Sequence, residues 1–316
     1  MSPHKGRLMS NLKVKVNMNR SLILPFAVIL GFIFNPWCNT IVAIVPYLIF
    51  TILLLNFTAV NIRKLRLLRM TGMNISLLLF QILVSLGGYI FVKAIWGNDI
   101  IAEGVLIAVL CPVAASSVVI SCLLGANRET VTAHVILGNL MVAIVAPIYF
   151  SFIGVQQQMP FIDSFLLILK RVSPIIAFPF FAALFMQIFL PKANDFISRF
   201  KSWTLYLWAL ALAITLGQTI NFIFVHGKEN VSSIVILGIV SIFICGIQFG
   251  LGKLIGKKYG DIVAGGQMLG QKNSALGIWM ANIYLNPLSS VSIALYSIWQ
   301  NLFNSWQLYR FEKKTK

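Results

Sequence analysis

Long runs of apolar residues, separated by short polar or basic stretches, occupy nearly the whole chain. A helix needs about 20 mostly apolar residues to cross the hydrocarbon core of a bilayer, so each run predicts one membrane-spanning helix. The pattern predicts ten helices, near residues 22–37, 39–59, 74–95, 102–124, 131–153, 164–190, 203–224, 231–255, 262–284 and 288–309. The predicted fold class is an all-α polytopic membrane protein, a single unit over 1–316 with polar tails at 1–21 and 310–316.

Composition supports this class and excludes others. The chain has 316 residues, of which 59% are hydrophobic and 10% charged, whereas soluble domains carry about 25% charged residues. The net charge of +17 does not indicate a nucleic-acid partner, because the basic residues lie in short loops between apolar runs. The four cysteines lie in or beside apolar segments without metal-ligand spacing, so we expect no disulfide, metal or cofactor.

The distribution of basic residues predicts the topology. Twenty of the 25 lysines and arginines lie in the two tails and in every second loop, and Lys93, Lys170, Arg171 and Lys228 lie in the other loops. Cytoplasmic loops are enriched in Lys and Arg, so both termini are expected to be cytoplasmic. We therefore expect an integral protein of the plasma membrane, in bacteria the inner membrane, with the lipid bilayer around it.

Two of the apolar runs are interrupted. The ninth contains a polar stretch of Gly, Gln, Lys, Asn and Ser at 265–277, with Lys272 in its middle. A lysine at the bilayer centre costs roughly 2.5–3.5 kcal/mol on insertion scales. The stretch is thus either a buried transport site or a surface loop with a solvated lysine, and the position of Lys272 favours the buried site. The fourth run is interrupted at Cys111-Pro112, followed by small residues, and proline breaks the helical hydrogen-bond pattern.

The interrupted runs are five apart, and a five-helix unit that is repeated once inserts with the opposite orientation. Interruptions at matching places in two halves indicate an inverted-repeat transporter with a site near the bilayer midplane. The expected repeats are 22–153 and 161–309.

Three motifs carry a resemblance to a known family. They are Cys111-Pro112 with the small residues that follow, Gln-Lys-Asn-Ser-Ala-Leu at 271–276, and Tyr-Ser-Ile-Trp-Gln-Asn at 296–301. In this order they resemble the bile acid:sodium symporter family, within the wider bile/arsenite/riboflavin transporter-like superfamily, and the chain looks like a divergent member. The resemblance implies that helices four and nine unwind and cross in a core domain. It also implies a panel domain of helices one, two, six and seven, and elevator-like alternating access for organic anions such as bile acids or small carboxylates.

The positions that the resemblance assigns to sodium ligands lack suitable oxygen atoms. They carry Met268 and Lys272 in the ninth helix, Val118 in the fourth, and Val131 and Val135 in the fifth, where Thr130 and Thr132 are adjacent. Hard cations prefer oxygen ligands, and a fixed ammonium repels Na⁺. We therefore expect transport that is not coupled to sodium, and no metal site.

Candidate site residues follow from the two interruptions and from the resemblance. Amide groups at the start of a half-helix carry a partial positive charge, and together with Lys272 they make an anion site. The candidate substrate-binding residues are Ala115, Ser116, Ser117, Lys272, Asn273 and Asn301. The candidate residues that hold the crossover are Gln81, Pro112, Gly270, Gln271, Lys272 and Ser274.

Other functions fit the sequence less well. An intramembrane enzyme needs paired acids, a Ser–His pair or a metal cluster, but every carboxylate lies in a loop or at a segment end. A pair of Ser116 with His134 would lack a third partner, and a packing role for His134 is the simpler interpretation. The tails are too short for the output domain of a sensor. A passive anion channel and an auxin-efflux-type carrier remain open, and the expected oligomeric state is a monomer.

Overall fold

The computed structural model describes residues 18–60, 71–154 and 159–315. These residues form α-helices and short 3₁₀-helices (η), without a strand in the described ranges. The first half contains α2 (Met18–Ile33), α3 (Asn35–Ile41), η1 (Val42–Ile44), α4 (Val45–Thr58), α5 (Gly72–Trp96), α6 (Asp99–Leu110), α7 (Ser116–Leu123) and α8 (Arg128–Ile153). The second half contains α9 (Phe161–Phe189), α10 (Pro191–Ser198), η3 (Arg199–Trp203), α11 (Thr204–His226), η4 (Gly227–Asn230), α12 (Val231–Lys258), α13 (Ile262–Gly270), α14 (Ser274–Tyr284), η5 (Pro287–Ser289) and α15 (Ser290–Thr315).

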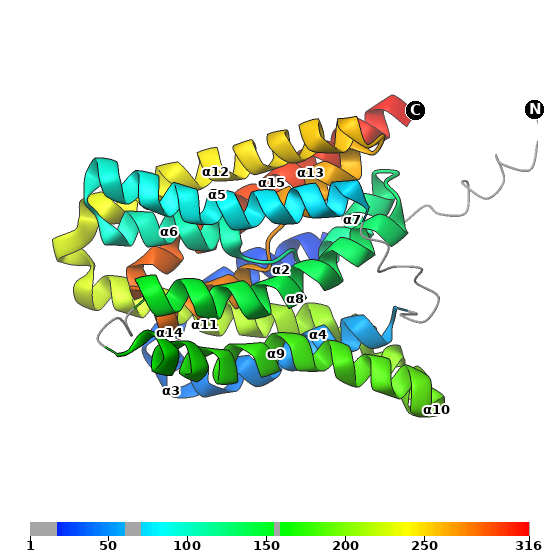
Figure 1. Cartoon of the computed structure of the whole chain (residues 1–316), viewed down its shortest axis with the longest axis horizontal. Helices are drawn as coiled ribbons and strands as arrows, with labels where there is room; N and C mark the ends of the chain where they lie inside the picture. Colours follow the sequence, from blue (N-terminus) through cyan, green and yellow to red (C-terminus); the bar gives the residue numbers. More distant parts are fainter. Residues whose placement is uncertain (1–17, 61–70, 155–158, 316) are drawn as a thin grey trace, which may run out of the picture.

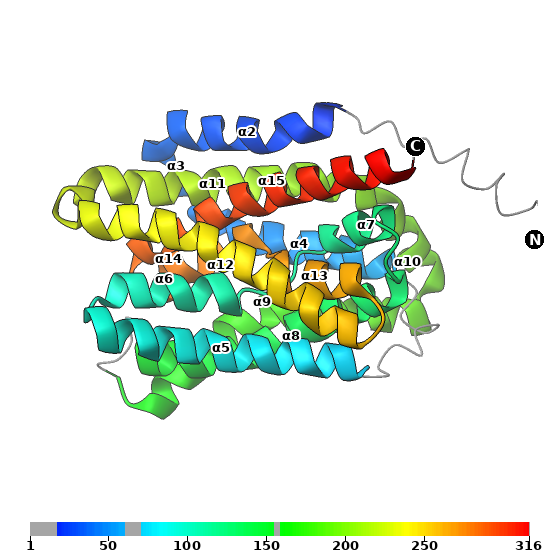
Figure 2. The ribbon, with the colours of Figure 1, turned by 90° about the horizontal axis from the view of Figure 1, so that it is seen from above.

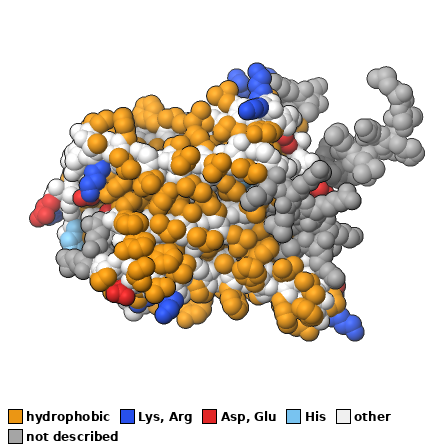
Figure 3. All heavy atoms as spheres, in the orientation of Figure 1, with side chains coloured by type: hydrophobic (Ala, Val, Ile, Leu, Met, Phe, Trp, Pro, Cys, Tyr) orange, Lys and Arg blue, Asp and Glu red, His pale blue; other side chains and the backbone are white. Residues whose placement is uncertain are grey.

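Apolar side chains cover much of the outer surface. Five helical stretches in the described residues are long and apolar enough to cross a membrane, and the last of them, Pro191–Lys258, contains both α11 and α12. Figure 3 shows hydrophobic side chains over most of the visible face, whereas the coloured charges lie toward its edges. An apolar exterior of this kind fits a lipid environment, so the predicted class, an all-α membrane protein, is confirmed.

The helices pack into two groups (Figures 1 and 2). In one group, α11 contacts α2, α3 and α4, and α4 contacts α9. In the other, α12 contacts α6, α13 and α15, and α5 contacts α6 and α8. The groups meet where α8 packs on α9 and where α11 packs on α14. The start of α2 and the end of α15 lie at the same end of the molecule (Figure 2).

Glycines allow the closest helix contact, between α12 and α13. A Cβ atom on Gly265 would collide with the carbonyl oxygen of Gly252, and Gly256 also touches α13 with its backbone. Small residues four apart let two helices approach closely and are common in membrane helix pairs. This contact fixes α13, and with it the interruption that follows, against a long continuous helix.

Both predicted interruptions are present as gaps between half-helices. The fourth run divides into α6 and α7, and the ninth divides into α13 and α14. The boundary between the first two runs was predicted at 37–39 but lies earlier, because α2 ends at Ile33 and α3 begins at Asn35. Pro36 lies in the first turn of α3, where the missing N–H of a proline costs the helix nothing.

Candidate functional site at the helix crossover

The two interruptions lie against each other in the interior. The backbone N–H of Asn273 donates to the carbonyl oxygen of Pro112 at 2.8 Å. In the opposite direction, the thiol of Cys111 donates to the carbonyl oxygen of Asn273 at 3.0 Å. These bonds join segments that are more than 160 residues apart in the chain, so the prediction that Pro112 belongs to a crossover is supported by direct contact.

The end of α6 is held by side chains from three other elements. The last four carbonyl groups of a helix receive no hydrogen bond from the helix's own backbone N–H groups. In α6 these carbonyl groups belong to residues 108–111. The bonds to them come from Gln248 Nε2 to Ala108 (3.2 Å), Lys272 Nζ to Val109 (2.8 Å), and Gln81 Nε2 to Leu110 (2.6 Å) and Cys111 (3.0 Å). Every terminal carbonyl of this half-helix is therefore satisfied inside the protein, as a membrane interior requires.

Lys272 is the basic member of this set. Its side chain is 1% exposed, and its nitrogen lies 2.8 Å from the oxygen of Val109 in the last turn of α6. A cation at the carboxyl end of a helix complements the helix dipole. The interpretation of Lys272 as a solvated residue in a surface loop is therefore wrong, because the side chain points inward and is covered.

The end of α13 is held by α15. The hydroxyl of Tyr296 donates to the carbonyl oxygen of Gly270 at 2.7 Å. The amide of Gln300 pairs with the backbone of Lys272 on both sides, since its Oε1 accepts from the N–H at 2.7 Å and its Nε2 donates to the carbonyl at 3.2 Å. Ser274 N–H donates to the same carbonyl at 3.0 Å. The backbone of Lys272, which lies in the unwound segment, is therefore hydrogen-bonded at both its N–H and its carbonyl group.

A chain of buried amides extends from this point. Gln271 donates to Gln267, and Gln267 Nε2 donates to Asn304 Oδ1 at 3.2 Å. Tyr296, Gln300 and Asn304 are four residues apart, so they share one face of α15. The sequence analysis included Tyr296 and Gln300 only as part of a family motif and did not name Asn304, although polar side chains at this spacing in an apolar helix were a usable signal.

The predicted substrate residues differ in burial and in hydrogen bonding. Ser117 is 0% exposed and its hydroxyl has no hydrogen-bond partner in the described residues, whereas Ser116 is exposed and Ala115 is half-buried. Asn273 accepts from the N–H of Leu276 at 3.4 Å and thereby caps α14. Asn273 and Ser117 lie at the starts of the two second half-helices, where backbone amides point toward the interruption.

Asn301 was predicted to bind substrate at the crossover, but its hydrogen bond lies within its own helix. Its amide donates to the carbonyl oxygen of Ser297 at 2.6 Å, within its own helix, and it makes no recorded hydrogen bond to the crossover. The adjacent Gln300 makes that contact, because neighbouring residues of a helix point about 100° apart. Within the motif at 296–301, the residue that contacts the interruption is thus Gln300, the one before Asn301.

Three of the five positions that the resemblance relates to sodium ligands come together in an apolar cluster. Met268 and Val131 are fully buried in a cluster with Met73 and Leu77, and Val118 packs on it. Val135 is also buried, outside this cluster. In the described part of the chain, no group of three or more His, Cys, Asp or Glu residues is arranged to hold a metal.

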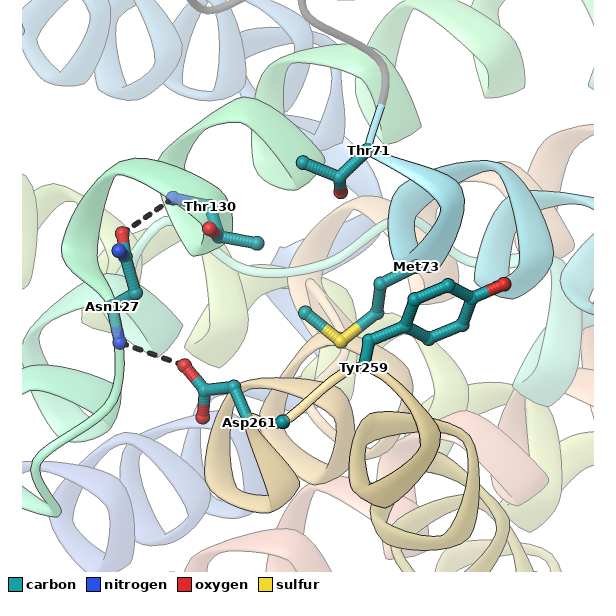
Figure 4. A pocket seen from close by; sticks show the side chains of 7 residues that line it. Thr71, Met73, Asn127, Thr130, Tyr259 and Asp261 are labelled. Atoms are coloured by element: carbon teal, nitrogen blue, oxygen red, sulfur yellow. Dashed lines mark hydrogen bonds between the residues drawn. The ribbon is translucent and has the colours of Figure 1, made fainter.

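A cavity of about 390 Å³ opens beside this cluster (Figure 4). It lies where α5, α8 and α13 begin and is lined by Thr71, Met73, Asn127, Thr130, Tyr259, Gly260 and Asp261. The carboxylate of Asp261 accepts from the N–H of Ala264 at 2.8 Å and from the N–H of Asn127 at 2.9 Å. No sequence pattern predicted this cavity, because its walls come from three separate stretches of the chain.

Comparison with known proteins identifies one transporter relative. No protein-family model matches the chain. The chain is 26% identical over 222 residues to the uncharacterized sodium-dependent transporter YocS of Bacillus subtilis, a match that covers 68% of this chain and 66% of that protein. The matched region is just under two thirds of the relative's length. The chain is thus similar to a membrane transporter, which agrees with its apolar helices.

Proposed function

We propose that the chain is a secondary transporter that moves a small organic anion across the membrane by alternating access, without coupling to sodium. The observation that carries the proposal is the burial of Lys272 at the contact between two interrupted helices. Interrupted helices that meet in the membrane interior are the typical binding site of secondary transporters. The similarity to a bacterial transporter supports the general role.

The charges at the crossover favour an anion. Lys272 brings a basic side chain, and α7 and α14 begin next to it, so that the positive ends of two helix dipoles face the same region. None of the hydrogen bonds recorded for the crossover involves a carboxylate. An anionic substrate would supply the missing negative charge, and a bile-acid-like molecule or a small carboxylate has the right chemistry.

The proposed architecture has ten membrane spans in two inverted repeats, 22–153 and 161–309. The spans are α2, α3 with α4, α5, α6 with α7, α8, α9, α11, α12, α13 with α14, and α15. Support comes from the interruptions in the fourth and ninth spans, and from the start of α2 and the end of α15 at one end of the molecule. The bias of basic residues toward the loops and tails at that end supports a cytoplasmic location for it. The helix group of α2, α3, α4, α9 and α11 would be the panel against which the remaining core moves.

Sodium independence is proposed from the side chains at the expected ligand positions. The name of the relative says that it is sodium-dependent. In this chain, Met268, Val131 and Val118 fill the corresponding region with apolar groups, and Na⁺ requires oxygen ligands.

A ligand screen tests the proposal. Purified protein is heated with a panel of organic anions, in sodium and in choline buffers, and hits are measured for counterflow in proteoliposomes. We expect stabilisation by at least one anion to the same extent in both buffers, and saturable counterflow of that anion. Stabilisation that requires Na⁺ would refute sodium independence, and flux without saturation or counterflow would indicate a passive channel.

A further inference from the structure

The hydrogen bonds around Lys272 suit a neutral amine better than an ammonium ion. An ammonium ion has three N–H donors and no acceptor. The one hydrogen bond recorded for Nζ goes to Val109, so an ammonium ion would leave two donors unused in a fully buried place. A neutral amine donates to the same carbonyl and leaves only one further N–H. The contact with Val109 therefore does not depend on the charge.

The groups around Lys272 supply no stable counter-charge. Its electrostatic neighbours are the thiols of Cys111 from the interruption and Cys245 from α12. Tyr296 of α15 is occupied with Gly270. The buried carboxylate of Glu103 lies six residues before Val109 in α6, about 9 Å along the helix, and accepts from the N–H of Asn286 at 2.7 Å. A permanent ammonium would be a buried charge without a paired anion, which is costly.

A second titratable side chain lies beside this site. His134 of α8 is 0% exposed. Its ring faces the carbonyl side of Met268 and lies within electrostatic range of Lys272. A neutral imidazole has one N–H donor and one acceptor nitrogen, so its ring can both accept and donate a proton.

The position of His134 along α8 connects it with the cavity of Figure 4. Thr130 lines that cavity, and His134 is one helical turn further on the same face of α8. Met73, which lines the cavity, also packs in the cluster that contains Met268. Residues Thr130, His134 and Lys272 therefore follow one another from the water-accessible end of the core to the crossover.

From this arrangement we propose that Lys272 is the proton-binding site of a proton–anion symporter, and that His134 relays the proton between Lys272 and the cavity. Lys272 is neutral when the site is empty. It takes up one proton with the anion, so that an ammonium–anion pair without net charge moves through the membrane. On release the N–H bond breaks, and the proton passes to a ring nitrogen of His134 and then to water in the cavity. This inference rests on the proposed function for its transport role, but the protonation state can be tested without a substrate.

The protonation of Lys272 is tested by the pH dependence of stability. An unfolded lysine is protonated below a pH of about 10. If the folded protein holds Lys272 neutral, the unfolded state binds one more proton, so stability rises with pH. Unfolding in mixed detergent micelles is measured for wild type, Lys272→Met and Lys272→Gln. We expect the unfolding constant of each variant, relative to wild type, to rise about tenfold for each pH unit between about pH 8 and 9.5. A ratio that does not change with pH overturns the proposal, whatever the ligand screen shows.

The relay is tested by proton exchange. NMR of protein with ¹⁵N-labelled lysine side chains identifies the Lys272 signal by its loss in the Lys272→Met variant, and exchange of its protons with water gives a rate. We expect His134→Phe to slow this exchange at least about tenfold. His226→Phe is the matched control, because His226 is exposed at the far end of α11 and should leave the rate unchanged. An unchanged rate in His134→Phe overturns the relay.

Discussion

Gln81→Leu tests whether the α6 cap stabilises the protein. The amide of Gln81 donates to the carbonyl oxygens of Leu110 and Cys111, and a leucine of similar volume removes both bonds without a large cavity. A buried carbonyl without a partner costs about 1–3 kcal/mol, so two cost about 2–6 kcal/mol. The Oε1 atom of Gln81 has no partner in the described residues, and its removal offsets part of this cost. We expect a loss of about 2–4 kcal/mol of unfolding free energy.

The measurement is denaturant unfolding of purified protein in mixed micelles, without ligand. Gln307→Leu is the control, because the same substitution in α15 removes an amide nitrogen that has no hydrogen-bond partner among the described residues, and we expect no loss of stability. Equal stability of Gln81→Leu and wild type would show that the carbonyl groups at the end of α6 find water or other donors. The structural account of the crossover would then be refuted.

Three further predictions concern other parts of the molecule. Reporter fusions after Arg69 and at the C-terminus should show cytoplasmic activity and a fusion at Gln157 should not, whereas an extracellular C-terminus would contradict the ten-span topology. Gly265→Leu should abolish monodisperse protein in size-exclusion chromatography, because its side chain collides with the backbone of α12, and wild-type behaviour would show that α12 and α13 separate easily. Met268→Glu combined with Lys272→Gln should introduce stabilisation by Na⁺ beyond that of wild type, because it adds oxygen atoms at the positions that the family resemblance assigns to sodium ligands; absence of a sodium effect in the double variant would contradict that assignment.

The interruptions could be predicted because they depend on local chemistry. Pro112 removes a backbone donor wherever it lies in a helix, and a lysine within an apolar run signals an inward-facing group whatever surrounds it. Long apolar runs likewise predict membrane-spanning helices without any knowledge of tertiary contacts. These features need no knowledge of distant contacts, so a single sequence contains them in full.

The bonding partners depend on distant contacts and were only partly predictable. Gln81 was expected at the crossover through the family resemblance alone, and nothing in its own neighbourhood indicates the end of α6. The prediction named Asn301 where the structure has Gln300. The motif identifies which helix contacts the crossover, but it does not show which side of that helix faces it. Gln248 has no local signal at all, since its target at Ala108 lies 140 positions away.

The two interrupted helices end in different ways, and the difference bears on coupling. The end of α6 receives a basic side chain from Lys272, whereas the end of α13 receives the neutral groups of Tyr296 and Gln300. A bound sodium ion can leave its site when a carrier resets, but a lysine is covalently attached and travels with the core in every step. The lysine side chain can lose its positive charge only by releasing a proton. A lysine at the crossover therefore changes which ion the site can exchange, and a carrier built around it has either proton coupling or a fixed charge that must be matched by its substrate in both directions.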